Sequence, residues 1–154
     1  MIELLVVIGI LTVLFAIVLI AVNPGRQFAQ ANNTQRRSDV NAILNAIHQY
    51  AAAKKGVLPT GIDTTERELC MPAATCGTVP PLAAASDTVN ICADLVPDYL
   101  AALPTDPQSS VPFVNCTSNY GTKYSVKSTG ALGGNRITVR ALTPEISETI
   151  SVTR

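Results

Sequence analysis

An uninterrupted apolar segment near the start of the sequence constrains this chain more than any other feature. From Leu4 to Val22 every residue is apolar except Gly9 and Thr12. Glu3 is the only charged residue before Arg26. As an α-helix the segment extends for roughly 28 Å at about 1.5 Å per residue, close to the hydrocarbon thickness of a bilayer. The segment therefore predicts a helix that can anchor the chain in a membrane.

A secretory signal peptide is the alternative interpretation of this segment. Its apolar core is shorter, follows positive charges and precedes a cleavage site made of small residues. In the printed sequence no Lys or Arg precedes the segment, and no such cleavage site follows it. These features favour an anchor.

Glu3 is unexpected in a simple anchor. A carboxylate in the first turn gains a little from the positive end of the helix dipole, but in hydrocarbon it is costly unless it is paired. The nearest expected cation is an α-amino group, of the same chain or of a neighbouring one. Glu3 therefore favours a helix that docks beside identical helices in one register.

Helical signals continue beyond the apolar segment. Asn23-Pro24-Gly25 predicts a local break, because Pro removes a backbone donor and Gly loosens the backbone. An apolar stripe at helical spacing then runs over Val40–Ala51, and Lys54-Lys55-Gly56 favours a helix end. We expect one helix from about residue 2 to 54, interrupted or bent near Pro24 and roughly 80 Å long. Half of it must protrude from a domain of this size.

Composition narrows the functional classes. The chain has 154 residues, a formal net charge of zero, one His and no Trp. Zero net charge argues against a polybasic nucleic-acid binder. The sequence contains no Gly-x-Ser-x-Gly motif, phosphate-binding loop or dinucleotide fingerprint. We expect no enzyme, no cofactor and no specific nucleic-acid partner, and we place His48 at a solvent-facing or subunit-interface position.

The start of the sequence resembles a known family. The segment Ile2-Glu3-Leu4-Leu5-Val6-Val7-Ile8-Gly9-Ile10-Leu11 resembles the N-terminus of mature type IV pilins and type II secretion pseudopilins, although Glu3 is two positions closer to the start than is usual there. Residues of a second segment resemble the turn region of pseudopilin-like pilins: Leu100, Leu103-Pro104, Asp106-Pro107, Tyr120-Gly121 and Tyr124. The resemblance implies an α+β pilin fold shaped like a ladle, with about three antiparallel strands packed on the C-terminal half of the long helix.

The resemblance also implies a function. The chain would be stored in the inner membrane and then polymerise into a cell-surface pilus for adhesion, motility or DNA uptake. Its partners would be other copies of itself, the pilus assembly machinery and prepilin peptidase. Glu3 would pair with the N-terminal amine of a neighbouring subunit, and the assembly residues would be Glu3, Leu4, Leu5, Ile8, Gly9, Pro24 and Gly25. The alternatives are a pseudopilin of a type II secretion system and a membrane-anchored monomeric binding domain.

The expected organisation has two parts. Residues 1–25 form the apolar anchor, and residues 26–154 form the head. Within the head, residues 56–91 are rich in Pro, Gly, Thr and Ala and predict one long surface loop. Residues 94–103 predict a short helix. Alternating patterns within residues 120–154 predict three antiparallel strands that cover the apolar stripe, with a Gly-rich turn at Gly130–Asn135.

Four cysteines occur in the head, at Cys70, Cys76, Cys92 and Cys116. An even number in an exported, loop-rich head predicts two disulfides, for which three connectivities are possible. We prefer Cys70–Cys76 and Cys92–Cys116. A zinc site is the competing interpretation, but no Cys-x-x-Cys pair is present, so no metal is expected.

Two further sets of polar residues have alternative interpretations. Arg26, Arg36 and Arg37 are expected on the filament wall, paired with carboxylates such as Asp39, rather than bound to DNA. Asp106 is expected to be a turn residue. Calcium binding by Asp106, Ser109 and Ser110 is the alternative, with a thin set of ligands.

Overall fold

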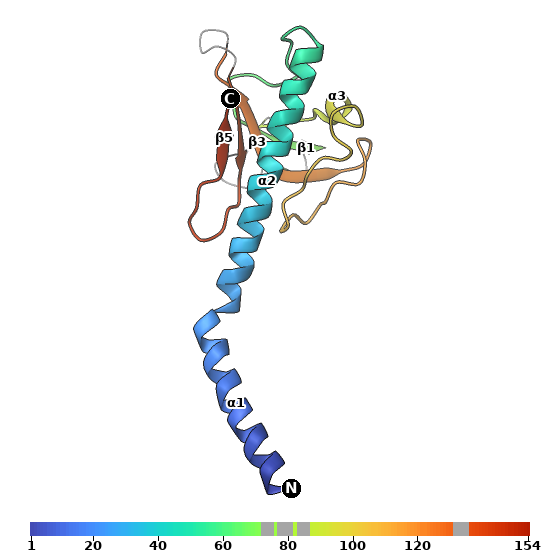
Figure 1. Cartoon of the computed structure of the whole chain (residues 1–154). Coiled ribbons are helices and arrows are strands. Elements are labelled where there is room, and N and C mark those ends of the chain that lie inside the picture. Colours follow the sequence, from blue (N-terminus) through green and yellow to red (C-terminus); the bar gives the residue numbers. More distant parts are fainter. Residues whose placement is uncertain (72–75, 77–81, 83–86, 131–135) are drawn as a thin grey trace.

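A long helical stem and a globular head make up the molecule (Figure 1). The computed structural model describes residues 1–71, 76, 82, 87–130 and 136–154. The N-terminus lies at the far end of the stem, and a five-stranded sheet packs on the second half of the second helix. The α+β class and the sheet packed after a long N-terminal helix are as expected.

The stem consists of two helices, α1 (Ile2–Val22) and α2 (Pro24–Ala53). They are separated by Asn23, whose φ of 41° and ψ of 81° lie in the left-handed region. Asn tolerates this region better than most residues, and its side chain accepts a hydrogen bond from the backbone N–H of Arg26. Pro24 occupies the first turn of α2, where its missing N–H costs nothing. The expected break near Pro24 is therefore a junction between helices, and Figure 1 shows the bend there.

The helix α2 ends at Ala53, next to the end predicted at about residue 54. Lys54 is the C-cap, and the N–H of Gly56 donates to the carbonyl of Ala51 at 2.7 Å. Lys55 and Gly56 both have positive φ, at 56° and 90°. This bond satisfies one of the carbonyls that a helix end leaves without a partner.

The sheet has the strand order β2-β1-β3-β4-β5. β1 pairs in parallel with β2, and the other neighbouring pairs are antiparallel. Val126 of β3 lies opposite Val139 of β4, which lies opposite Val152 of β5. The strands are β1 (Arg67–Met71), β2 (Thr88–Val89), β3 (Tyr120–Ser128), β4 (Ile137–Ala141) and β5 (Ser151–Thr153).

The strands β1 and β2 correct the prediction of a single loop over residues 56–91 and of a sheet with three strands. β1 escapes a search for alternation because Glu68, Leu69 and Cys70 are all buried in succession, and β2 has only two residues. The expected antiparallel strands within residues 120–154 are present as β3, β4 and β5. The predicted turn at Gly130–Asn135 lies outside the described residues except for Gly130.

The short helix is also corrected. The prediction of a helix over residues 94–103 is replaced by α3 (Cys92–Leu95). Pro97 explains the early end, because a proline disfavours helical geometry at the preceding residue, and Val96 is extended with φ −107° and ψ 130°.

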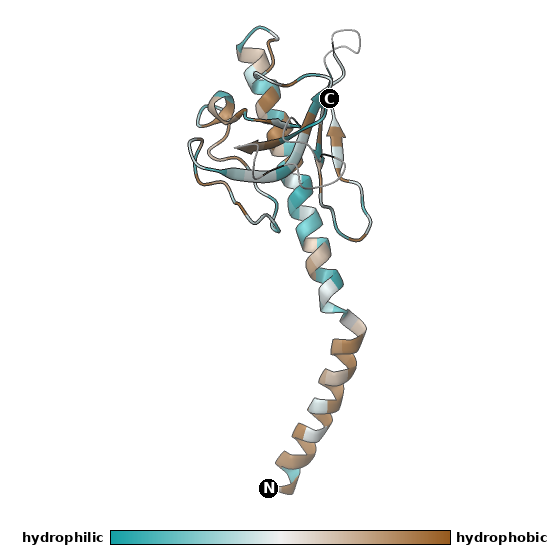
Figure 2. Ribbon diagram, turned by 180° about the vertical axis from the view of Figure 1, so that it is seen from behind, coloured by the Kyte–Doolittle hydropathy of each residue, from teal (hydrophilic) through white to brown (hydrophobic). Residues whose placement is uncertain are grey.

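The hydrophobic core lies between the apolar stripe of α2 and the sheet. Val40, Ile43, Leu44 and Ile47 of α2 are fully buried, and Ala51 at the end of the stripe is half-buried. Burying each large side chain of this stripe contributes about 1.5–3 kcal/mol. The other large core side chains include Tyr120, Tyr124 and Val126 of β3 with Val139 of β4. Figure 2 shows the contrast between the two halves of the stem. α1 is apolar along most of its length, whereas α2 carries both hydrophilic and hydrophobic residues.

Two disulfides stiffen the head. Cys70 is bonded to Cys76, and Cys92 is bonded to Cys116, with Cα–Cα distances of 6.2 and 5.4 Å. This is the connectivity preferred from the sequence. The second bond ties α3 to the loop that precedes β3.

Candidate assembly and membrane segment

The surface of α1 is not covered by the rest of the chain. Ile2–Ala21 is long and apolar enough to cross a membrane, and none of this stretch is buried. From Ile2 to Ile20, the large apolar residues of α1 are exposed by between 46% at Leu11 and 84% at Ile20. An apolar surface of this size is far larger than monomeric soluble proteins leave in water. Lipid or other protein must therefore cover α1.

The polar groups of α1 differ in their bonding. The hydroxyl of Thr12 donates to the carbonyl of Ile8 at 2.6 Å, so it is satisfied inside the helix. Glu3 lies in the first turn and is exposed. Within the described part of the chain, the side chain of Glu3 makes no hydrogen bond or ion pair. Its carboxylate is free to meet a cation from outside the molecule.

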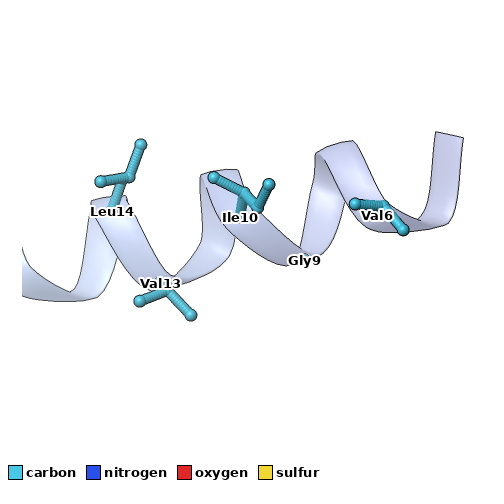
Figure 3. A pocket seen from close by; sticks show the side chains of 5 residues that line it. All are labelled: Val6, Gly9, Ile10, Val13 and Leu14. Atoms are coloured by element: carbon cyan, nitrogen blue, oxygen red, sulfur yellow. The ribbon is translucent and has the colours of Figure 1, made fainter. Parts of the chain in front are cut away.

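A shallow notch interrupts the surface of α1 at Gly9 (Figure 3). It is lined by Val6, Gly9, Ile10, Val13 and Leu14, whose spacing places them on one face of the helix. A Cβ atom at Gly9 would meet nothing within 4 Å. The notch has room for a side chain of another helix, and small residues allow close helix packing of this kind in membranes.

The other sequence-predicted assembly residues lie exposed along α1 and at its junction with α2. Leu4, Leu5 and Ile8 are exposed by 72%, 69% and 57% on the outside of α1. Pro24 and Gly25 lie at the junction with α2 and are exposed. The structure therefore distributes these residues along one uncovered helix and its junction.

A buried ionic cluster fastens the head to α2, and sequence reasoning missed it. Arg36 was expected on an outer wall, but its side chain is fully buried. Its Nε donates to Oδ2 of Asp106 at 2.6 Å and its Nη2 to Oδ1 at 3.0 Å. Its Nη1 donates to Oε2 of Glu145 at 2.8 Å and to Oδ1 of Asn33 at 2.9 Å. These bonds, that to Asp106 first, raise the pKa of Arg36 above its ordinary value although burial acts against them.

A signal for this cluster is present in the sequence. Arg36 lies four residues before Val40 and seven before Ile43, so it continues the apolar stripe. An arginine on a buried stripe needs a partner, since an unpaired buried charge is costly. The spacing therefore indicated the burial, but it could not identify Asp106 and Glu145 as partners.

Asp106 is a turn residue, as expected, and it is also an anchor. Its Oδ1 accepts the N–H of Gln108 at 2.8 Å and its carbonyl accepts the N–H of Ser109 at 2.9 Å. Both carboxylate oxygens also bind Arg36. The carboxylate that calcium binding would need is thus already engaged. Among the residues that the structure describes, no group of three or more His, Cys, Asp and Glu residues is placed to hold a metal.

Asp39 does not pair with an arginine, which corrects the expectation from the sequence. Its Oδ2 accepts the hydroxyl of Tyr124 at 2.7 Å, and its Oδ1 accepts the side-chain amide of Gln35 at 3.2 Å. Burial raises the pKa of Asp39, and these two hydrogen bonds act in the opposite direction. Burial also raises the pKa of Tyr124. His48 is half-buried on α2, and its Nε2 atom is buried without a hydrogen-bond partner in the described structure.

The segment between β4 and β5 forms a second part of the fastening. The side-chain amide of Asn33 donates to the carbonyl of Glu145 at 2.7 Å, and the N–H of Glu145 donates to Oδ1 of Asn33 at 2.9 Å. Arg37 and Glu148 form an exposed ion pair at 2.8 Å. The head is therefore held on α2 by buried and exposed polar contacts as well as by the core.

Comparison with known proteins gives no match to a family model, to a curated protein or to a solved structure. The functional argument therefore starts from the contrast between the two halves of the stem. The sheet shares one hydrophobic core with α2 and is fastened to it by polar contacts, whereas α1 leaves its apolar surface for something outside the molecule.

Proposed function

We propose that this chain is the structural subunit of a helical filament of the type IV pilus class, and that it polymerises through α1. The observation that carries the proposal is the uncovered apolar surface of Ile2–Ala21, joined to a folded head. The arrangement of a long helix with a sheet on its second half is compatible with a pilin-like layout. Before assembly, α1 lies in the inner membrane; after assembly, it lies in the filament core and the heads form the wall at the cell surface.

Transfer of α1 from lipid to a helix bundle leaves its apolar surface covered in both states. The gain from the hydrophobic effect is therefore small, and association depends on close packing and polar contacts. The notch at Gly9 supplies a place for close packing. The junction at Asn23-Pro24-Gly25 lets the stem change direction between the core and the wall.

Glu3 sets the register in this proposal. Its carboxylate has no partner within the described structure, and an unpaired carboxylate in an apolar bundle is expensive. Pairing with the N-terminal amine of a neighbouring copy removes that cost in one register only. Pilus assembly machinery and prepilin peptidase are the proposed accessory partners, and adhesion, motility or DNA uptake are the proposed tasks.

Electron microscopy of material sheared from producing cells, with mass spectrometry to identify the chain, tests the proposal. Wild-type chain is expected in long filaments. Glu3→Ala and Glu3→Gln are expected to reach the membrane but to form no filaments. Thr12→Val is the matched control, because the Thr12 hydroxyl bonds within its own helix and its loss should leave assembly intact.

Three outcomes favour other functions. Short filaments retained in the periplasm would point to a pseudopilin of a type II secretion system. Wild-type chain found only in the membrane fraction would point to an anchored monomeric binding domain. Normal filaments from Glu3→Ala would refute the role of Glu3.

A further inference from the structure

Two exposed features lie at opposite ends of the head. We name residues Lys54–Val57, at the end of α2, the upper turn, and residues Glu145–Glu148, between β4 and β5, the lower loop. The lower loop is bonded to Asn33, which lies 21 residues before Lys54 on α2. The two features are thus separated by about 30 Å along the helix axis. Figure 1 shows them at the two ends of the head.

The lower loop holds an unfavourable backbone and an exposed apolar side chain. Ile146 and Ser147 have φ of 58° and 53°. The left-handed region is unfavourable for a β-branched residue, and such conformations concentrate at functional positions. The side chain of Ile146 is nevertheless 41% exposed. The bonds of Glu145 and Glu148 to α2 hold this conformation in place.

An open acceptor lies two residues after Ile146 in the sequence. Arg37 and Asn33 both bind Oε2 of Glu148. Oε1 of the same carboxylate has no hydrogen-bond partner within the described residues, and the side chain is 37% exposed. The lower loop therefore contains an exposed apolar residue and, two residues later, a carboxylate oxygen that can accept from a cation.

The upper turn presents the complementary groups. Lys54 and Lys55 are exposed and form no ion pair within the described part of the chain. The Nζ of Lys54 lies 5.9 Å from the ring centroid of Tyr50. Val57 is 62% exposed, and its N–H donates to the carbonyl of Lys54 at 3.2 Å, which fixes the turn. Two cations thus lie beside an exposed apolar side chain.

We propose that the upper turn of one subunit binds the lower loop of a second copy, with Lys54 or Lys55 at Glu148 and Val57 against Ile146. This inference rests on the proposed filament. The two surfaces differ and lie at opposite ends of the head, so the contact is head-to-tail, and it extends along a polymer unless its rotation closes a ring. Repetition of such a contact produces an open polymer. After α1, the exposed large apolar residues in the described structure are Phe28, Val57, Val114 and Ile146, so the contact covers two of these four.

Cysteine cross-linking in assembled filaments tests the contact. All four native cysteines are in disulfides, so introduced thiols can be oxidised selectively. The full-length double variant Val57→Cys/Ile146→Cys is expected to give a ladder of covalent multimers on non-reducing gels. Each single variant, and the control pair Val57→Cys/Val114→Cys, should give no ladder. Val114 is 71% exposed elsewhere on the head.

Charge reversal adds a functional readout. Lys54→Glu/Lys55→Glu should lower the yield of sheared filaments, and Glu148→Lys should lower it as well. Combining the three changes should restore part of the yield, because the opposite charges face each other again. A triple variant with a yield no higher than that of Lys54→Glu/Lys55→Glu or of Glu148→Lys would overturn the assignment of charges.

The outcomes separate this contact from the proposed function. Wild-type chain that forms no filaments would refute both. Filaments of normal yield in which Val57→Cys/Ile146→Cys gives no ladder would refute the contact alone. A ladder in the double variant, with none in the control pair, would establish that the upper turn and the lower loop of neighbouring copies meet.

Discussion

Arg36 and Asp106 form a two-pronged ion pair in which both side chains are completely buried. The pair joins α2 to the segment that leads into β3, across 70 residues of sequence. Glu145 adds a third carboxylate oxygen from the segment after β4. Arg36 on α2 thus binds two segments of the head that are distant in sequence. The free energy of these bonds contributes to the stability with which the head packs on α2.

Removal of Arg36 should destabilise the head severely. Arg36→Ala leaves Asp106 buried and unpaired, a situation that typically costs 3–5 kcal/mol, so we expect a loss of about that size in the free energy of unfolding. Arg37→Ala is the matched control, because its ion pair with Glu148 is exposed and worth about 1 kcal/mol or less. Urea unfolding of the full chain in detergent, followed by near-ultraviolet circular dichroism, measures both. Equal losses would contradict the anchoring role of Arg36.

The features predicted from sequence were those that repeat. The apolar segment Leu4–Val22 and the stripe Val40–Ala51 have a length or a period that only a helix satisfies. Residues 124–127 of β3 alternate between apolar and polar in the sequence, and β4 alternates in its burial as well. Strand β1 does not alternate, because both faces of the sheet bury its side chains. Its existence depends on pairing with β3, whose partner residues lie between 49 and 59 positions away, and local patterns carry no record of that pairing.

Arg36 shows a different limit. A charged residue is expected at the surface by default. The predicted apolar stripe of the helix begins at Val40, so it does not include Arg36. The partners Asp106 and Glu145 lie 70 and 109 residues away. The candidate assembly segment is easier to predict from the sequence, because Glu3, Gly9 and Thr12 are exceptions in an apolar segment. The notch at Gly9 is visible only in the three-dimensional structure, because it depends on which side chains flank the glycine.

Stability should depend on pH through Asp39. Burial raises the pKa of Asp39 in the folded state above its ordinary value of 3.8. A carboxyl group with a raised pKa contributes stability that is fully present below the unfolded pKa and is lost as the pH rises through the folded pKa. In Asp39→Asn the side chain does not ionise, so the variant does not lose stability in this way as the pH rises. We therefore expect the variant to gain stability relative to wild type as the pH rises from acidic to neutral.

The urea midpoint of both proteins, measured across this pH range, tests the prediction. Glu145 acts with the opposite sign, because hydrogen bonding to Arg36 lowers the pKa of Glu145, so its contribution is lost as the pH falls. Since Glu145 is present in both proteins, its effect cancels in the difference between them. A difference between Asp39→Asn and wild type that does not change with pH would count against the prediction.

The two disulfides should differ in their contribution to stability. Cys92 and Cys116 are 24 residues apart, whereas Cys70 and Cys76 are 6 apart. Loop-closure entropy predicts about 3.5 kcal/mol for the longer loop and about 2 kcal/mol for the shorter. Cys92→Ala/Cys116→Ala should therefore lower the thermal midpoint more than Cys70→Ala/Cys76→Ala. Calorimetry of both double variants in detergent measures the order, and a reversed order would contradict the entropic account.

Filling the notch at Gly9 should separate assembly from folding. A Cβ at Gly9 meets nothing within the chain, and Leu is favoured over Gly in a helix by up to about 1 kcal/mol. Gly9→Leu should therefore leave the head folded and α1 in the membrane fraction. In the filament, the added side chain occupies the space proposed for a neighbouring helix, so the yield of sheared filaments should fall sharply.

A graded pair of controls makes this last experiment decisive. Gly9→Ala adds one carbon and should lower the filament yield less than Gly9→Leu. Ala21→Leu adds bulk about 120° around the same helix and should lower it least, because Ala21 does not line the notch. Yields are compared after quantifying the chain in the membrane fraction, so that poor insertion is not counted as poor assembly. Wild-type yields from Gly9→Leu would show that no neighbouring helix enters the notch, and packing in the filament core would then have to use another face of α1.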